Sequence, residues 1–329
     1  DLGNYSFDLP SELIANEPLR DRSGSRLLIA NRNSEQLEDR WFTDLPSSLR
    51  PGDLLVLNNT KVFPARLYGR IETGAKIEVF LIQEVDNSAW KVLARPGKRL
   101  RPGKVIVFDD TLSAEVVERC SDGSFTIGFS PASDLEAKID AIGRTPLPPY
   151  IKRDPNAIDE DRERYQTVYA QNRGAIAAPT AGLHFTPELL SKIRTCGIDT
   201  AEITLHVGYG TFEPVRSSDL SRHRVAAERY EIGEEAAGRL EKARKEGRRI
   251  VAVGTTTTRT LEYALGKYGD FRPSSGLADL TILPGYRFRA INALLTNFHL
   301  PESSLLVLVA TFGGHQFIMR AYEHAVEAK

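Results

Sequence analysis

The sequence predicts an α/β protein: a large mixed-sheet α/β domain with an inserted small antiparallel β-barrel domain. Two changes along the chain support this prediction. From about residue 54 to residue 129, short strands are separated by turn signals such as Asp122-Gly123, a pattern typical of a small barrel. From Asp134 onward, strands alternate with helices, which predicts a mainly parallel sheet covered by helices. The 329 residues, 41% hydrophobic, suffice for cores of this size.

The barrel domain is predicted over residues 61–133, and the α/β domain over residues 1–60 and 134–329. The first ~50 residues are assigned to the larger domain from the change in sequence pattern that follows them, which would make the barrel an insertion. The predicted barrel strands are Val62–Ile71, Lys76–Val85, Ala89–Pro96, Lys104–Phe108, Ser113–Arg119 and Ser124–Phe129.

The α/β domain contains a clear helix start at Thr186, which is a suitable N-cap, followed by Pro187 at the first helical position. This helix is expected to run to Cys196 and to end at Gly197. The elements expected after it are strand Ile203–Val207, helix Glu234–Glu246, strand Arg249–Gly254, a helix from about Thr257 to Leu265, strands near Leu280–Leu283 and Ala293–Asn297, and a last helix through Glu323.

Composition excludes several classes of protein. With 43 Lys and Arg against 44 Asp and Glu, the net charge is −1, which argues against a broadly cationic nucleic-acid binder but allows a local basic patch. Two isolated cysteines argue against a disulfide framework or a cysteine-built zinc site and fit a reducing cytosol. The longest apolar run, Leu305–Ala310, is too short to cross a bilayer, and Asp1–Pro10 does not resemble a signal peptide. We therefore expect a cytoplasmic protein without a membrane partner.

Residues 177–186 form the first candidate ligand loop, because small and polar residues there lie between an apolar strand and a capped helix. Ligands of open α/β sheets bind beyond the carboxyl ends of strands. Gly182 would let the backbone approach a ligand, and His184 titrates near neutral pH. An equally weighted alternative is that Gly182 serves the turn and His184 caps the neighbouring helix.

The second candidate is the segment from Leu205 to Phe212, which contains His206, Gly208, Gly210 and Thr211. A dinucleotide-binding fingerprint would require a third glycine at the position of Glu213, so that motif is absent. On these residues alone, a structural turn with a hydrogen-bonded histidine is favoured over a ligand site.

The third candidate is the run of four threonines, Thr255 to Thr258, followed by Arg259. A strand that leads into a helix N-terminus offers unpaired N–H groups, a favourable dipole and hydroxyl donors, which suit a carboxylate or a phosphate. No P-loop lysine follows. Capping requires only one threonine, so a ligand site is favoured.

The fourth candidate, residues 296–304, contains Asn297 and His299 at the end of an apolar strand. Asparagine can pair with a nucleobase edge and histidine can move a proton. Alone, this segment slightly favours a packed loop held by Pro301. If all four strands are parallel and adjacent, the four loops would converge into one polar pocket.

Basic residues are concentrated in one predicted barrel turn. Such groups are usually solvated, but this one would be a plausible contact for phosphates if the substrate is RNA. It comprises Arg95, Lys98, Arg99, Arg101 and Lys104. The six histidines show no metal-binding spacing, so no metal is expected.

Taken together, the motifs resemble the S-adenosylmethionine:tRNA ribosyltransferase-isomerase family of queuosine biosynthesis. The matching segments follow the family's order nearly from end to end. They are Phe7–Pro10, Asp21–Leu28, Gly52–Gly69, Pro146–Arg153, Arg164–Ala170, Ala178–Thr186, Leu205–Phe212, Val253–Glu262 and Leu294–Leu308.

This resemblance implies a two-domain monomer that transfers and isomerises the ribosyl group of S-adenosylmethionine. The acceptor would be 7-aminomethyl-7-deazaguanine at the wobble position of the tRNA anticodon loop. The product would be epoxyqueuosine in tRNA, with adenine and methionine released. A non-catalytic RNA-binding module remains the alternative, since it would explain the barrel and its basic patch.

On this hypothesis, the candidate catalytic residues are His184, His206, His299 and Glu228, in no order. Thr255 to Thr258 and Arg259 could hold the methionine carboxylate, and Asn297 could pair with a purine edge. Tyr165, Tyr169 or Phe185 could stack on a base, although core packing is the commoner role of an aromatic residue. Further candidate binding residues are Thr180, Gly182, Gly208, Gly210, Thr211 and Arg153.

The sequence departs from the family pattern at several positions. The family usually has a Met-His-x-Glu block after His223, where this chain has Val225-Ala226-Ala227-Glu228. Ala278 and Thr281 replace the usual Thr and Phe, and the usual C-terminal tail is missing after Lys329. A missing catalytic histidine at Ala226 would impair activity.

Overall fold

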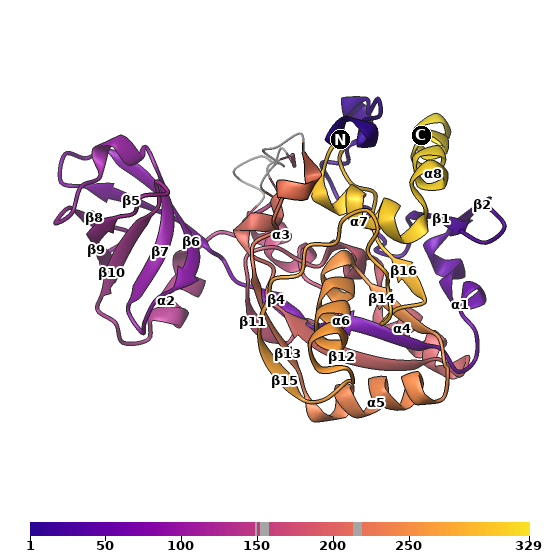
Figure 1. The fold of residues 1–329 in the computed structure, drawn as a ribbon. Coiled ribbons are helices and arrows are strands. Elements are labelled where there is room, and N and C mark those ends of the chain that lie inside the picture. Colours follow the sequence, from indigo (N-terminus) through magenta and orange to yellow (C-terminus); the bar gives the residue numbers. More distant parts are fainter. Residues whose placement is uncertain (149, 152–157, 213–218) are drawn as a thin grey trace. The chain divides into compact units, whose positions relative to one another are not determined.

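The computed structural model describes residues 1–148, 150–151, 158–212 and 219–329 (Figure 1). The chain divides into two compact units. Unit 1 comprises residues 1–61, 148–153 and 166–329, and unit 2 comprises residues 62–147 and 154–165. Each unit has its own sheet and core.

Unit 2 is built on a closed six-stranded antiparallel barrel with the strand order β10-β7-β6-β5-β8-β9. Side chains alternate between its interior and solvent, so that Ile77, Val79 and Leu81 of one strand are fully buried. The inserted barrel predicted from the sequence is therefore confirmed. Its strands are β5 (Arg66–Ile71), β6 (Lys76–Glu84), β7 (Ala89–Arg95), β8 (Val105–Val107), β9 (Ser113–Arg119) and β10 (Phe125–Ser130).

The barrel unit extends beyond the predicted boundary at residue 133. Residues 134–147, with helix α2 (Leu135–Ile142), group with the barrel, and so does α3 (Ile158–Arg164). Arg144 forms an antiparallel bridge with Arg66 at the start of β5. Tertiary pairing thus ties this segment to the barrel, although its helical pattern resembles the α/β part of the sequence.

Unit 1 contains a six-stranded mixed sheet in the order β15-β13-β12-β3-β14-β16. Four neighbouring strands are parallel: β12 (Asp199–Leu205), β3 (Leu54–Asn58), β14 (Ile250–Val253) and β16 (Ala293–Leu295). Two antiparallel strands complete the sheet, β13 (Glu228–Ile232) and β15 (Ser274–Ala278). Every residue of β3 is buried, as expected for a central strand of a parallel sheet covered on both faces.

Helices pack on this sheet (Figure 1). Helix α4 (Pro187–Thr195) shares a buried cluster with Leu55 and Leu57 of β3. Helices α5 (Glu234–Lys245) and α6 (Thr255–Tyr268) contact β3, β12 and β14. The predicted start of α4 is confirmed, because the Thr186 hydroxyl accepts the N–H of Leu189 at 3.1 Å.

The remaining elements of unit 1 lie around the sheet. The hairpin β1 (Arg26–Asn31) and β2 (Gln36–Trp41) precedes the short helix α1 (Leu45–Ser48), and β4 (Thr60–Val62) pairs with β11 (Asn172–Ala175). The 3-10 helices of the two units are η1 (Leu2–Tyr5), η2 (Ser11–Leu13), η3 (Phe42–Asp44), η4 (Gly97–Arg99), η5 (Thr180–His184), η6 (Tyr209–Phe212) and η7 (Leu220–Arg222).

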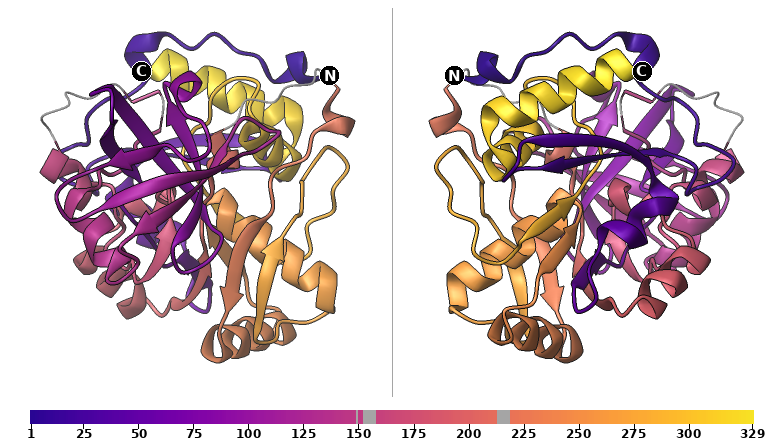
Figure 2. Two further views of the ribbon diagram at one scale, coloured as in Figure 1. Left: turned by 90° about the vertical axis from the view of Figure 1, so that its left-hand side faces the viewer. Right: turned by 90° about the vertical axis from the view of Figure 1, so that its right-hand side faces the viewer.

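The C-terminal region differs from the prediction in two ways. The last helix is divided into α7 (Ser304–Gly313) and α8 (His315–Ala328) by Gly314, whose φ of 92° no helix accommodates. The predicted strand Leu280–Leu283 is wrong, since β15 forms instead over Ser274–Ala278. The N-terminal segment lies beside α8 (Figure 2), where the ring of Tyr5 contacts His315 edge-on.

In the described part of the chain, no single helix is long and apolar enough to cross a membrane. Helices α7 and α8 satisfy that test only as a pair, and they bend by 116° where they meet. Both helices contribute residues to a buried core, among them Leu306, Phe317 and Tyr322.

Candidate active site

Polar residues gather where the four parallel strands of unit 1 end. Asn58 ends β3, His206 follows β12, Thr255 follows β14 and Thr296 follows β16. Because these strands are parallel neighbours, their carboxyl ends lie at the same edge of the sheet, where ligands of open α/β sheets bind. The predicted convergence holds for three of the four loops. The first loop follows β11, which pairs with β4 outside this sheet.

The first loop nevertheless reaches the fourth through a side-chain contact. His184 Nε2 lies 3.0 Å from the Oδ1 of Asn297. Since that oxygen can only accept, Nε2 carries the proton in this contact. Burial lowers the pKa of His184 below its usual value, and the hydrogen bond to Asn297 opposes this shift only in part. A hydrogen bond to the backbone of Arg22 also opposes the shift, and burial remains the largest influence, so His184 is neutral at neutral pH.

His206 is held by a residue that the sequence analysis did not single out. Its Nδ1 lies 2.8 Å from the hydroxyl oxygen of Thr60, which is completely buried. Burial and then the charge of Arg229 lower the pKa of His206, while Glu231 opposes them. His206 is consequently neutral at physiological pH and can accept a proton.

Glu228 and Arg259 form a buried ion pair at 2.6 Å, with the two side chains 3% and 4% exposed. Glu228 also accepts the backbone N–H of Gly208 at 2.9 Å. Arg259 donates in addition to the carbonyl oxygens of Leu280 and Ala226. The guanidinium thus has a counter-charge within the protein and binds together β13, α6 and the segment that contains Ala226.

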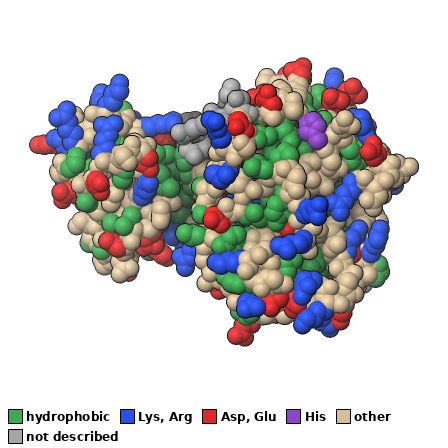
Figure 3. Space-filling model, in the orientation of Figure 1, with side chains coloured by type: hydrophobic (Ala, Val, Ile, Leu, Met, Phe, Trp, Pro, Cys, Tyr) green, Lys and Arg blue, Asp and Glu red, His purple; other side chains and the backbone are tan. Residues whose placement is uncertain are grey.

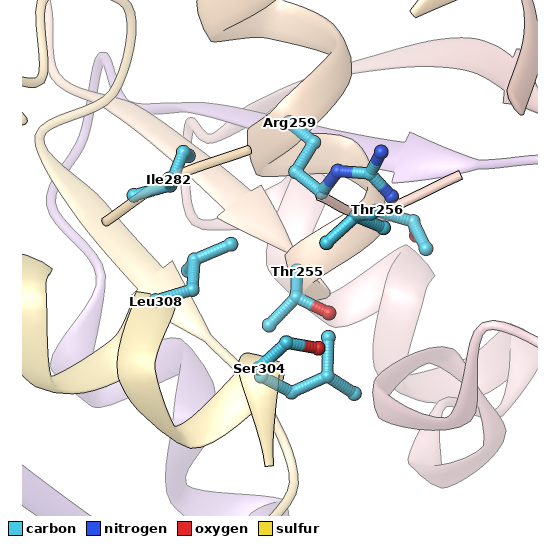
Figure 4. A pocket seen from close by; sticks show the side chains of 8 residues that line it. Thr255, Thr256, Arg259, Ile282, Ser304 and Leu308 are labelled. Carbon is cyan, nitrogen blue, oxygen red and sulfur yellow. The ribbon is translucent and has the colours of Figure 1, made fainter. Parts of the chain in front are cut away.

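The four threonines of the third loop fall into two pairs. Thr257 and Thr258 donate their hydroxyls to the carbonyl oxygens of Val253 and Gly254 inside the helix, so these hydroxyls are already engaged. Thr255 and Thr256 instead line a small pocket together with Arg259. Figure 4 shows these side chains opposite Ser304 and Leu308 of α7. The pocket has a free volume of about 10 Å³, which is at the lower limit of the room that one water molecule needs.

His299 is the most strongly shifted histidine of the site. Its Nε2 lies 3.0 Å from the Thr296 hydroxyl, and its backbone N–H donates to the hydroxyl of Tyr322 at 3.1 Å. Burial lowers the pKa of His299 to about 4. It therefore stays neutral across the physiological range.

The shifted pKa of His299 predicts an acid-sensitive stability. The unfolded chain binds a proton near pH 6.5, whereas the folded protein does so only near pH 4. The contribution to stability is fully present above pH 6.5. It falls as the pH drops toward 4, by about 3 kcal/mol. Denaturant unfolding between pH 7 and pH 4 should show this slope, and His299→Gln should flatten it. The same slope in His299→Gln and in a control variant at the exposed His315 would refute the assignment.

Gly182 lies beneath two buried hydroxyls that come from the segment before β11. A Cβ atom on Gly182 would lie 2.2 Å from the hydroxyl oxygen of Tyr169 and 2.8 Å from the methyl carbon of Thr167. Neither hydroxyl has a hydrogen-bond partner among the described residues. Burial raises the pKa of Tyr169, and the charge of Glu202 adds to that shift. The group close to Gly182 is thus a tyrosine of the protein itself, and the approach of a ligand to Gly182 stays a prediction.

Gly182→Ala should lower the free energy of unfolding by about 1–3 kcal/mol, because the new methyl group overlaps Tyr169. Tyr169→Phe removes the overlapping oxygen and should recover part of this loss in the double variant. As a control, Gly238→Ala in α5 meets no atom within 4 Å. That change should stabilise the helix by about 0.5–1 kcal/mol. Equal denaturant midpoints for the Gly182 and Gly238 variants would contradict the close contact.

Several predicted binding residues lie away from the site, or outside the residues that the structure describes. Phe185 is completely buried and packs against Phe42 with ring centroids 5.1 Å apart, so its ring has no open face for a base. Tyr165 is buried and belongs to unit 2. Thr180 begins η5, while Gly210 lies in η6 against the Ala226 methyl group. Arg153 and the side chain of Thr211 lie outside the described residues.

The sequence analysis missed the polar end of β3. Asn58 donates to the carbonyl oxygen of Leu205 and to the Thr256 hydroxyl, and its side-chain oxygen accepts the N–H groups of Leu205 and Thr60. The residues Asn58-Asn59-Thr60 follow an apolar strand just as the four chosen loops do. The same rule would therefore have identified them.

The predicted basic group belongs to the barrel unit. Arg95, Lys98, Arg99 and Arg101 are exposed around η4 and the turn before β8, and Lys104 is partly exposed, 3.8 Å from Glu72. Figure 3 shows Lys and Arg side chains on the surface of this unit. Across the residues that the structure describes, no group of three His, Cys, Asp or Glu side chains could hold a metal ion.

The fold and the site define an α/β protein with an inserted barrel and a polar site at the carboxyl edge of its parallel strands. The family model described as queuosine biosynthesis protein matches residues 2–329, and the chain belongs to this family.

Relatives cover nearly the whole chain. S-adenosylmethionine:tRNA ribosyltransferase-isomerase from Trichlorobacter lovleyi is 49% identical, over 98% of this chain and 94% of its own. The enzyme of the same name from Symbiobacterium thermophilum is 49% identical, over 99% and 95%. The crystal structure of S-adenosylmethionine tRNA ribosyltransferase from Thermotoga maritima is similar with a TM-score of 0.54 and 37% identity, over 99% and 95% of the two chains. These names are those of an enzyme, which overturns the alternative of a non-catalytic RNA-binding module.

Proposed function

We propose that this chain transfers the ribosyl group of S-adenosylmethionine to 7-aminomethyl-7-deazaguanine at the wobble position of tRNA and isomerises it. The product is epoxyqueuosine in tRNA, and adenine and methionine are released. Membership of the family and relatives that are 49% identical support the reaction. The observation in the site that carries the proposal is the set of neutral histidines, His184, His206 and His299, on strand-end loops.

The reaction needs a group that removes a proton from carbon. The sulfonium of the substrate acidifies the neighbouring C5′ protons and makes methionine a leaving group. A neutral histidine removes one C5′ proton. Adenine then leaves with the electron pair of its glycosidic bond and takes up a proton, and the aminomethyl nitrogen bonds to the opened sugar. Methionine leaves with the electron pair of the C–S bond, so the sulfonium loses its positive charge. The overall reaction therefore releases one proton, which balances this loss of charge.

We assign the base to His206, with His184 as the second candidate. A base must lie within about 3 Å of its proton in the reactive complex, which requires an accessible nitrogen. His206 is partly exposed, and no hydrogen bond occupies its Nε2 within the described residues. In contrast, Glu228 is already paired with Arg259, and the Thr296 hydroxyl occupies the Nε2 of His299. We therefore propose that Glu228 and His299 stabilise the structure of the site and do not act as the base.

Substrate contacts follow from the same geometry. Thr255 and Thr256, at the N-terminus of α6, suit the methionine carboxylate, and Arg259 keeps that N-terminus next to Glu228. Asn297 and Tyr169 suit a nucleobase, and the basic group of the barrel suits tRNA phosphates. A wobble base lies in a loop, so turning it out of the stack costs less than opening a duplex. We further propose a cytoplasmic monomer that needs no metal, which sedimentation and metal analysis would test.

The decisive experiment incubates the protein with S-adenosylmethionine and tRNA that carries 7-aminomethyl-7-deazaguanine. Adenine and methionine are then quantified. Release of both in equal amounts is expected, and tRNA with unmodified guanine is the control that should give neither. Binding of both substrates without release would contradict the proposal and implicate Ala226. Full turnover in each single replacement of His184, His206, His299 and Glu228 would refute the assigned residues.

A further inference from the structure

His206 is enclosed by two residues from the β4–β11 pair. The Thr60 hydroxyl lies 2.8 Å from Nδ1 at one edge of the imidazole. At Gly174 the backbone lies so close to the ring that a Cβ there would be 2.7 Å from both Cε1 and Nδ1. The φ of Gly174 is +153°, near the edge of the region that favours glycine. The ring therefore cannot tilt toward β11 without a movement of the backbone at Gly174.

The hydroxyl of Thr60 has one proton and two neighbours that could receive it. One is Nδ1 of His206 at 2.8 Å, and the other is the carbonyl oxygen of Asn172 at 3.4 Å. A carbonyl oxygen can only accept, so that contact is a hydrogen bond only if Thr60 donates to it. Thr60 must then accept from His206, which requires the proton on Nδ1. This is the one arrangement of protons in which both contacts are hydrogen bonds, and Thr60 is too deeply buried for water to replace either.

A polar network fixes the position of Thr60. The side-chain oxygen of Asn58 accepts the N–H of Thr60 at 3.2 Å. Asn59 accepts the Thr204 hydroxyl at 2.7 Å and the side-chain amide of Asn172 at 3.2 Å, and its own amide donates to Glu202. The hydroxyl that faces His206 is thus anchored to β3, β11 and β12 at once.

We infer that Thr60 is a positioning residue that holds His206 in the tautomer with the proton on Nδ1, so that the lone pair of Nε2 accepts the proton in the reaction. The role of Nε2 rests on the proposed function, whereas the tautomer rests on the protein alone. The charges of Arg229 and Glu231 act on the pKa of His206 in opposite directions, and burial favours the neutral form. A neutral imidazole with a fixed tautomer can act as a base without first losing a proton.

The tautomer can be measured directly without any substrate. In ¹⁵N spectra of the whole protein labelled at histidine, recorded at pH 7.5, His206 should show a protonated Nδ1 and an unprotonated Nε2. His206→Gln identifies its signals by their loss. Thr60→Ser retains the hydroxyl and should keep this pattern. Thr60→Val has nearly the same shape but no acceptor, and it should lose the preference for Nδ1–H.

The kcat of the Thr60 variants should change together with the tautomer of His206. Thr60→Val is expected to lower kcat about tenfold or more with KM for S-adenosylmethionine little changed, while Thr60→Ser stays near the wild type. A proton on Nε2 in the wild-type protein would overturn the inference. So would a wild-type kcat in a Thr60→Val protein that has lost the Nδ1 proton. If instead the wild-type protein releases no adenine, the proposed function fails, and the spectra still decide the tautomer.

Discussion

Replacement of Glu228 by alanine is expected to lower the free energy of unfolding by about 3–5 kcal/mol and to abolish turnover. The change leaves the guanidinium of Arg259, which is 4% exposed, without a counter-charge in a site that water barely reaches. It also removes the acceptor of the Gly208 N–H, so the loop that follows His206 loses its attachment to β13. Denaturant unfolding measures the first effect, and adenine release measures the second.

Two control variants test this explanation. Replacement of both members of the pair, Glu228→Met with Arg259→Met, removes the unpaired charge and should recover much of the stability but none of the activity. The exposed pair Glu235–Arg239 on α5 is a matched control, in which Glu235→Ala should cost less than about 1 kcal/mol. If Glu228→Ala proved no more destabilising than Glu235→Ala, the buried pair would not hold the site together.

Glu262→Ala is expected to be similarly severe, although the residue lies outside the proposed chemistry. The carboxylate of Glu262 is 1% exposed and accepts the backbone N–H groups of Arg289, Ala290 and Ile291 at 2.9–3.3 Å. It also accepts the hydroxyl of Tyr286 at 3.1 Å. Alanine would leave these donors without an acceptor, among them the buried N–H groups of Ala290 and Ile291, at a cost of about 3–5 kcal/mol.

A graded series makes the Glu262 prediction specific. Glu262→Gln keeps one acceptor oxygen and should cost about 2 kcal/mol, whereas Tyr286→Phe removes a single hydrogen bond and should cost about 1 kcal/mol. The segment held by Glu262 leads into β16 and on to Asn297, so hydrogen exchange at residues 289–295 should rise in the same order. Equal stability losses in all three variants would show that the carboxylate does not organise this segment.

The sequence alone identified features that depend on local patterns. The alternation of apolar residues and the regular turns of residues 66–130 predict the hairpins of the barrel, because each hairpin is specified by its own neighbours. The pairings that close the barrel, β5 with β8 and β7 with β10, join strands that are not consecutive. The cap at Thr186 and the start of α5 at Glu234 were likewise predicted from adjacent residues. Three of the four candidate loops were placed at the correct edge because each follows a recognisable strand.

Pairings between distant residues were decided by the tertiary structure. Nothing near Glu228 in the sequence indicates that its partner is Arg259, 31 positions later, or that Asn297 lies beside His184. The pairing of β11 with β4, and the burial of Phe185 against Phe42, depend on which surfaces meet after folding. Strand register and charge pairing are set by long-range packing, in which residues of one type can satisfy many local patterns but fit only one set of neighbours.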